Sequence, residues 1–193
     1  LMLTRGILQS CIPKDCSLPI VLRVSSGNSI LNEDMSNEKL CVSTEDAIRL
    51  NASAVAFSIY VGAEYEHQTL VEFSKLINQA HRYGIPVLAV TAVGKKMNRD
   101  VGYVSLASRI AAELGADIIK TYYCEDFSHL VNVCHVTVVI AGGKKIPEAD
   151  ALQLAHNAIS DGASGVDMGR NIFQSECPIA MIQAVRRLSL IHI

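Results

Sequence analysis

The stretch Asp117–Tyr123 reads DIIKTYY, an apolar run with a single lysine at its centre. In an extended strand successive side chains point to opposite faces, so Ile118, Lys120 and Tyr122 share one face. Burial among apolar neighbours penalises the ammonium form of a lysine. A neutral amine can attack a carbonyl carbon and form an imine. The stretch therefore predicts either a Schiff-base lysine on a buried strand or a strand-end lysine that reaches water.

Further apolar, β-rich segments lie on both sides of this stretch, as in a parallel sheet covered by helices. Between them, amphipathic patterns predict helices over Thr69–Tyr83, Ser105–Leu114 and Pro147–Ile159, each with a glycine near its end. Strands alternate with helices, at a typical spacing of roughly thirty residues. This pattern predicts an α/β fold, either a βα barrel or a doubly wound sheet. The predicted strands are Leu1–Thr4, Pro19–Val24, Ala54–Tyr60, Pro86–Val90, Asp117–Tyr122, Val136–Ile140 and Gly165–Met168.

Two glycine-bearing loops favour the barrel. Ala141–Lys145 (AGGKK) and Gly169–Asn171 (GRN) follow the last two predicted strands. In βα barrels the loops after strands seven and eight commonly bind phosphate. Glycines let backbone N–H groups approach phosphate oxygens, and an arginine adds a bidentate contact. A lone Gly-Gly pair is usually only a turn, but two such loops downstream of a strand lysine predict a phosphate site in a TIM (β/α)8 barrel.

The seven predicted strands are one fewer than an eight-stranded barrel requires. We therefore expect a barrel that is incomplete at the N-terminus, with its first strand before Leu1, because the chain starts inside an apolar segment. No linker divides the sequence, so residues 1–187 are predicted to form one barrel domain. Residues 188–193 read LSLIHI, resemble a translated sequencing adapter, and are predicted to be a non-native tail.

Composition excludes several classes of protein. Half of the 193 residues are hydrophobic, 19% are charged, and the net charge is −2, which gives no reason to expect a nucleic-acid or membrane partner. The six cysteines include no C-x-x-C pair, which is typical of reduced thiols in a cytoplasmic protein. The six histidines show no ligand spacing, so no metal site is expected.

Polar residues after other strands have two interpretations each. Ser25–Asn28 would line the same mouth as the glycine loops, although an ordinary turn is the commoner meaning of such a stretch. Glu64, Glu66 and His67 could supply an acid or base, or could solvate the start of a helix. Asp167 lies on the last strand and could face either way.

The motifs at Ile119–Tyr123 (IKTYY), Ile140–Lys145 (IAGGKK) and Gly165–Gln174 (GVDMGRNIFQ) resemble those of the DeoC/FbaB aldolase family, and the likeness extends over most of the chain. The resemblance implies an aldolase-type barrel in which Lys120 is the catalytic, imine-forming residue. It also implies a binding site for the substrate phosphate made of Gly142, Gly143, Gly169 and Arg170.

Two departures from the family pattern bear on the reaction. The early-strand aspartate of the family would lie before Leu1, and the catalytic tyrosine of its archaeal-type fructose-bisphosphate aldolases is absent from Val90–Gly94 (VTAVG). An aldolase needs an acid/base for the hydroxyl that becomes the aldehyde. A thiolase does not, because coenzyme A attacks the acyl carbonyl directly. Tyr122, on the Lys120 face, could replace the missing tyrosine, whereas Tyr123 should face away.

The resemblance therefore favours a thiolase, an acyltransferase that cleaves a phosphorylated pentanedione with coenzyme A into dihydroxyacetone phosphate and acetyl-CoA during catabolism of the quorum signal autoinducer-2. The alternatives are a class I aldolase of the fructose-bisphosphate type and a catalytically inactive sugar-phosphate-binding barrel. We expect no bound cofactor, coenzyme A as co-substrate, a small phosphorylated ketone as substrate, and a homo-oligomer as the assembly.

Overall fold

The structure, a computed structural model, describes residues 1–29, 31–32, 34–92 and 97–190. Within these residues, seven strands form one parallel sheet. Each strand coincides with an apolar segment predicted from the sequence, so that prediction is confirmed. The strands are β1 (Met2–Thr4), β2 (Val21–Arg23), β5 (Ala54–Ile59), β6 (Val87–Thr91), β7 (Ile118–Tyr122), β8 (Thr137–Ala141) and β9 (Gly165–Asp167).

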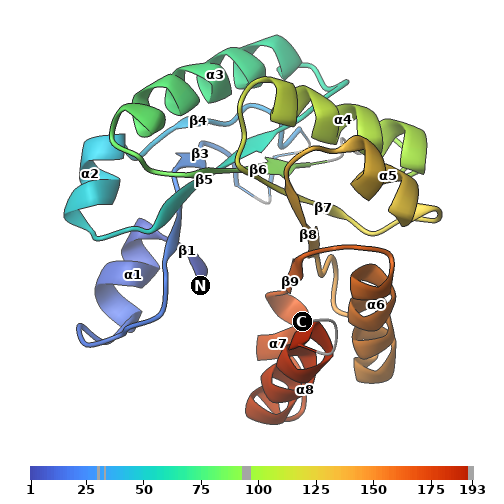
Figure 1. Ribbon diagram of the computed structural model, residues 1–193. Coiled ribbons are helices and arrows are strands. Elements are labelled where there is room, and N and C mark those ends of the chain that lie inside the picture. The colour runs from blue at the N-terminus through green and yellow to red at the C-terminus, as the bar shows by residue number, and fades with distance from the viewer. Residues whose placement is uncertain (30, 33, 93–96, 191–193) are drawn as a thin grey trace.

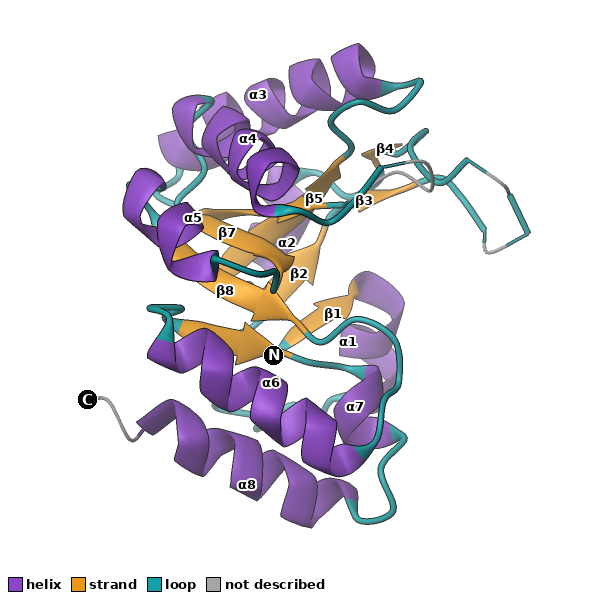
Figure 2. Cartoon of the chain, turned by 90° about the vertical axis from the view of Figure 1, so that its right-hand side faces the viewer, coloured by secondary structure: helices purple, strands orange, loops and turns teal. Residues whose placement is uncertain are grey.

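Helices connect the strands and cover the outer face of the sheet, as Figure 1 shows. Figure 2, from the side, shows α6 and α8 stacked below the sheet, next to the last strands in its order. The helices are α1 (Arg5–Cys11), α2 (Thr44–Arg49), α3 (Glu66–Arg82), α4 (Val101–Glu113), α5 (Phe127–Val133), α6 (Glu148–Ser160), α7 (Arg170–Phe173) and α8 (Pro178–Leu190).

The sheet order β1-β2-β5-β6-β7-β8-β9 follows the order of the chain, as in a βα barrel and unlike a doubly wound sheet. The sheet curls strongly, and β1 and β9 lie at its two ends (Figure 1). The described residues therefore form an incomplete (β/α) barrel, which confirms the predicted fold class.

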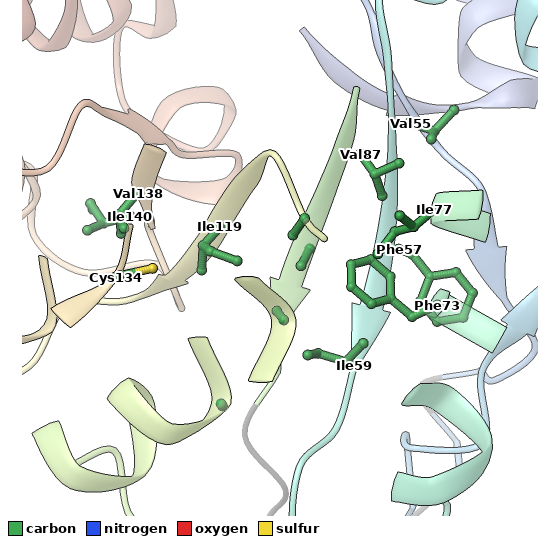
Figure 3. Packing of buried hydrophobic residues seen from close by; sticks show 14 of the residues in the cluster. Val55, Phe57, Ile59, Phe73, Ile77, Val87, Ile119, Cys134, Val138 and Ile140 are labelled. Atoms are coloured by element: carbon green, nitrogen blue, oxygen red, sulfur yellow. The ribbon is translucent and has the colours of Figure 1, made fainter. Parts of the chain in front are cut away.

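The hydrophobic core lies between the sheet and its covering helices. Phe57 of β5 packs against Phe73 of α3, with ring centroids 5.9 Å apart (Figure 3). Ile119 and Ile140 fill the same layer from β7 and β8 and are fully buried. Because side chains alternate along a strand, the neighbours of these core residues face the concave side of the sheet. The core therefore decides which side chains reach the barrel interior.

The three helices predicted from the sequence are confirmed as α3, α4 and α6. α3 and α4 begin three to four residues earlier than their apolar patterns, at Glu66 and Val101. The side chain of Asp100 accepts a hydrogen bond from the Tyr103 backbone N–H at 2.9 Å, which caps α4 at its true start. Apolar spacing locates the buried face of a helix, but its first turn depends on such polar caps.

A short two-stranded sheet, β3 (Ser25–Ser26) and β4 (Lys39–Leu40), was not predicted. It lies beside β5 and outside the main sheet (Figure 2). The turn interpretation of Ser25–Asn28 is therefore corrected in its first half, because Ser25 and Ser26 pair with β4. The signal is weak in sequence because neither strand is longer than two residues.

Helix α8 continues through residues 188–190, and residues 191–193 lie outside the described residues. The expectation of a non-native tail over 188–193 stays a prediction. In the part of the chain that the structure describes, no helix combines the length and apolarity needed to cross a membrane.

Candidate active site

Lys120 extends from β7 into the concave side of the sheet. Its neighbour Ile119 belongs to the core, so the lysine side chain takes the opposite face. The Nζ atom donates a hydrogen bond to Asp167 Oδ2 at 2.8 Å and lies 3.9 Å from Met2 Sδ. Met2 and Asp167 belong to the strands at the two ends of the sheet. A side chain that touches both of them crosses the barrel interior, and only 13% of the lysine side chain is exposed.

Asp167 is the nearest charged partner of the Lys120 amine, and its inward orientation could not be decided from sequence. The sequence did not predict this pair, because the two residues are 47 positions apart. A carboxylate in contact with an amine can orient it and can accept the proton that an ammonium must lose before it attacks a carbonyl. The structure thus adds Asp167 to the residues that surround the lysine.

The two glycine-bearing loops lie side by side at the ends of β8 and β9. Asn171, which is 1% exposed, donates from Nδ2 to Gly142 O at 2.6 Å and to Lys144 O at 3.2 Å, and its Oδ1 accepts from Ile146 N at 3.0 Å. One buried amide therefore joins the loop after β8 to the segment after β9. The sequence alone predicts no role for Asn171, because its partners are backbone atoms that no side-chain pattern reveals.

The backbone at Gly142 and Gly143 requires glycine for two different reasons. A Cβ atom on Gly142 would come within 2.8 Å of Met168 Cγ and 3.2 Å of Asn171 Nδ2. Gly143 has a φ of +68°, a conformation that side chains disfavour. The register places this loop directly above the interior site, because Ala141 pairs with both Tyr122 and Asp167.

Arg170 begins α7, directly after Gly169, and is exposed. Among the described residues no ion pair or side-chain hydrogen bond holds its guanidinium. Lys144 and Lys145 are exposed on the neighbouring loop. These basic side chains are therefore accessible to an anion, and the phosphate-binding role of Arg170 stays a prediction.

Tyr122 and Tyr123 point in different directions. The Arg99 guanidinium stacks over the Tyr122 ring, with Cζ 3.8 Å from its centroid. The Tyr123 hydroxyl donates to Asp161 Oδ2 at 2.7 Å, and this hydrogen bond, followed by burial, raises the pKa of Tyr123 to about 12. Tyr123 therefore faces the helix layer. Of the segment Val90–Gly94, from which the aldolase tyrosine is absent, Val93 and Gly94 lie outside the described residues.

A cavity of about 460 Å3 opens between the ends of β1 and β2. Ser25, Ser26 and Asn28 contribute to its wall, together with Thr4 and Arg23. The polar stretch after β2 therefore borders an open space at the end of the barrel where the strands finish. This is the face at which active sites of this fold collect.

The remaining candidates do not join this site. Glu66 Oε2 accepts a hydrogen bond from the Gly62 N–H at 3.1 Å, which agrees with a role at the start of α3. Among the described residues, the Lys120 amine contacts Asp167 and Met2, and neither Glu64 nor His67 is one of its hydrogen-bond partners. The six cysteines, all of them described, are free thiols. No cluster of potential metal ligands occurs among the described residues.

Comparison with known proteins identifies relatives of two kinds. The chain is 58% identical over 189 residues to the 3-hydroxy-5-phosphonooxypentane-2,4-dione thiolase of Yersinia pseudotuberculosis and 57% identical to that of Klebsiella pneumoniae. Each match covers 97% of this chain, but the chain spans only 65% and 64% of the length of these relatives.

Among solved structures, an archaeal fructose 1,6-bisphosphate aldolase superposes with a TM-score of 0.88 at 31% identity, over 97% of this chain and 77% of the other. A second structure of such an aldolase, at 30% identity and the same TM-score, has its catalytic lysine covalently bound to the carbinolamine intermediate of the substrate. Residues 6–175 match the DeoC/LacD family of aldolases. The predicted resemblance is confirmed, and the chain belongs to the DeoC/LacD aldolase family.

Proposed function

We propose that the protein is a Schiff-base thiolase that transfers an acetyl group from 3-hydroxy-5-phosphonooxypentane-2,4-dione to coenzyme A, in catabolism of autoinducer-2. One observation carries the proposal: the Lys120 amine lies in the barrel interior, 2.8 Å from a carboxylate. The thiolase names of relatives at 57–58% identity support the choice of reaction and substrate. The aldolase with a substrate bound to its lysine supports the chemistry of the amine.

The reaction proceeds through an imine on Lys120. The amine attacks the ketone next to the phosphorylated carbon, and water leaves as the iminium forms. The sulfur of coenzyme A then attacks the acetyl carbonyl, and the bond between that carbonyl carbon and the hydroxyl-bearing carbon breaks. The bonding electrons become the enamine on Lys120, and a proton restores the iminium. Water releases dihydroxyacetone phosphate and the free amine.

The substrate phosphate would bind between the two loops that Asn171 joins. Gly142 and Gly143 on one side and Gly169 on the other lack side chains that would keep an anion from the backbone N–H groups. Arg170 supplies a charged contact from the start of α7. Phosphate held here would place the neighbouring ketone carbon near Lys120, because Asp167 contacts the amine and precedes Gly169 by only two residues.

A class I aldolase is the second candidate, and the structural similarity to fructose 1,6-bisphosphate aldolases favours it. The two reactions share the lysine imine and the phosphate site but differ in the acid/base that an aldol cleavage requires. Ala92, in the segment where archaeal-type aldolases are expected to carry their tyrosine, has no hydroxyl to supply that step.

The decisive experiment compares two substrates with and without coenzyme A, using the full-length protein. We expect cleavage of the phosphorylated pentanedione only when coenzyme A is present, and little or no cleavage of fructose 1,6-bisphosphate. The products to measure are acetyl-CoA and dihydroxyacetone phosphate. Rapid cleavage of fructose 1,6-bisphosphate without the coenzyme would replace the thiolase by the aldolase.

We also infer a cytoplasmic location and a homo-oligomeric assembly. Six free thiols support the location, because disulfides form in oxidising compartments. The exposed apolar residues Phe173, Ile179 and Ile182 on α7 and α8 support a further contact surface. Coenzyme A enters this proposal as a co-substrate, not as a resident cofactor.

A further inference from the structure

Arg23 is held across the barrel from the glycine loops. Its neighbour Leu22 belongs to the core, so Arg23 faces the interior, where its Nη2 donates to Ser58 Oγ at 3.0 Å. Ser58 pairs in register with Val90, and Val90 pairs with Lys120. The guanidinium therefore lies in the same layer of the barrel as the Lys120 amine.

A buried carboxylate fixes this guanidinium. Glu38 is 3% exposed and accepts at Oε1 from Arg23 Nη2 at 2.6 Å and from the Tyr60 hydroxyl at 3.0 Å, and at Oε2 from Ser25 Oγ at 2.6 Å. Burial, together with the Glu38 charge, raises the pKa of Tyr60, so its hydroxyl stays neutral and keeps donating. Both Glu38 oxygens are occupied, which suits a positioning residue rather than a base.

One edge of the guanidinium remains available. The Nε atom donates to Ser25 O at 3.2 Å and Nη2 is shared by Glu38 and Ser58, while the described residues leave Nη1 without a hydrogen bond. The Arg23 side chain is one-third exposed and lines the cavity of about 460 Å3. Arg23 thus lines open space at the level of the lysine, and its guanidinium keeps N–H donors that the described residues do not use.

The sheet places this donor at the far end of the proposed substrate. β8 and β9, which carry the phosphate loops, lie on one side of the curled sheet, and β1 and β5, which flank β2, lie on the other (Figure 1). A substrate with its phosphate at those loops and its ketone on Lys120 can extend its acyl end across the barrel toward β2. The cavity beside Arg23 gives a thiol room to approach that end.

We propose that Arg23 is a catalytic residue that binds the oxygen of the acyl group during its transfer, and that Glu38 positions it; this rests on the proposed thiolase function. As the carbon–sulfur bond forms, the carbonyl π electrons move onto oxygen, where the Arg23 N–H group stabilises the charge. The electron pair on oxygen then re-forms the carbonyl, and the carbon–carbon bond breaks, so that its electrons form the Lys120 enamine. The thiol has lost one proton and the enamine carbon gains one, so the step is balanced.

The test separates acyl transfer from imine formation in the full-length protein. Dihydroxyacetone phosphate has the phosphate and the ketone but no acyl end. With Arg23→Lys, borohydride trapping of this compound on Lys120 should stay within about twofold of wild type. Coenzyme A-dependent kcat should fall on the order of 10²–10³-fold, the loss typical of removing an oxyanion donor.

A second variant guards against the cost of an unpaired buried Glu38. Arg23→Gln combined with Glu38→Gln removes both charges. This double variant should also keep borohydride trapping near the wild-type level while its kcat falls. The matched control is Arg109→Gln with Glu113→Gln, which removes an exposed arginine–glutamate pair on α4 and should change neither quantity. Circular dichroism melting curves verify that each variant is folded.

Two results would overturn the inference. Arg23 variants with wild-type kcat would show that the acyl oxygen binds elsewhere, and variants that lose trapping in proportion to kcat would make Arg23 structural. Failure of the proposed function would give a different result, because the wild-type protein itself would then show no coenzyme A-dependent cleavage. In that case the role of Arg23 would be rejected together with the proposed function.

Discussion

At the scale of single residues, Lys120 combines burial in the barrel with a charged partner, and the sequence predicted only the first of these. It lies among apolar strand residues, yet Asp167 gives its amine a charged partner inside the barrel. Replacing it by arginine keeps the positive charge beside Asp167 but removes the nucleophile. We expect Lys120→Arg to remain folded and to lose roughly 10⁴-fold or more in kcat, a loss typical of removing a covalent nucleophile.

Mass spectrometry after borohydride reduction checks the same assignment. In the wild-type protein the trapped substrate should be attached to Lys120, and the Lys120→Arg variant should carry no adduct. Lys144 and Lys145 are exposed on the adjacent loop and serve as internal controls. An adduct on either of them would assign the nucleophile to that loop.

The prediction for Arg170 concerns only the affinity for a phosphorylated ligand. Its guanidinium is exposed beside the two glycine loops, so Arg170→Ala should leave the fold unchanged. Loss of a charged hydrogen bond costs roughly 1.5–3 kcal/mol, or on the order of tenfold to a hundredfold in affinity. Titration calorimetry should show this loss for a phosphorylated ligand and not for its unphosphorylated analogue. Equal losses for both ligands would make Arg170 a structural residue.

At the scale of elements, the loop after β8 depends on close approach to the segment after β9. A methyl group at Gly142 would overlap Met168, whose Cγ lies 2.8 Å from the new Cβ position. Gly142→Ala should therefore lower the free energy of unfolding by roughly 1–3 kcal/mol, as overpacking does, and weaken phosphate binding. The measurements are a denaturant titration and ligand binding.

Gly102→Ala is the control for this loop variant. Gly102 lies in α4, where an added Cβ meets only the Asp100 side chain at 3.5 Å, an ordinary contact. Alanine favours helix over glycine, so this variant should be neutral or slightly more stable. Similar destabilisation by both substitutions would show that the cost comes from the loss of glycine in general and not from Met168.

The elements also show how far the sequence predicts this protein. Apolar runs such as Ala54–Ile59 identify the strands because a parallel sheet buries both faces, and every residue of β5 is buried. The glycine loops were found because their residue types suit phosphate. The Arg23–Glu38 pair was not found, because Glu38 lies in a polar stretch that reads as an ordinary loop and becomes buried only when that stretch folds back over β2.

At the scale of the whole molecule, burial differs strongly between the middle and the ends of the sheet. β5 pairs on both sides and is wholly buried, whereas β9 pairs only with β8 among the described residues and is half-buried throughout. Backbone amides open locally where few buried contacts hold them. Hydrogen exchange of this chain should be at least about tenfold slower in β5 than in β9. Equal protection would indicate that β9 is covered on its other side.

Because every strand of the main sheet pairs with the strand before it in the chain, each pairing closes a loop on the order of 20–35 residues, whose entropic cost is modest. The sheet can therefore grow one strand at a time in the order of synthesis. Lys120 enters with β7, but Asp167 arrives two strands later, with β9. The ribosome thus makes the nucleophile well before its carboxylate partner, and the ion pair inside the barrel forms only when β9 docks.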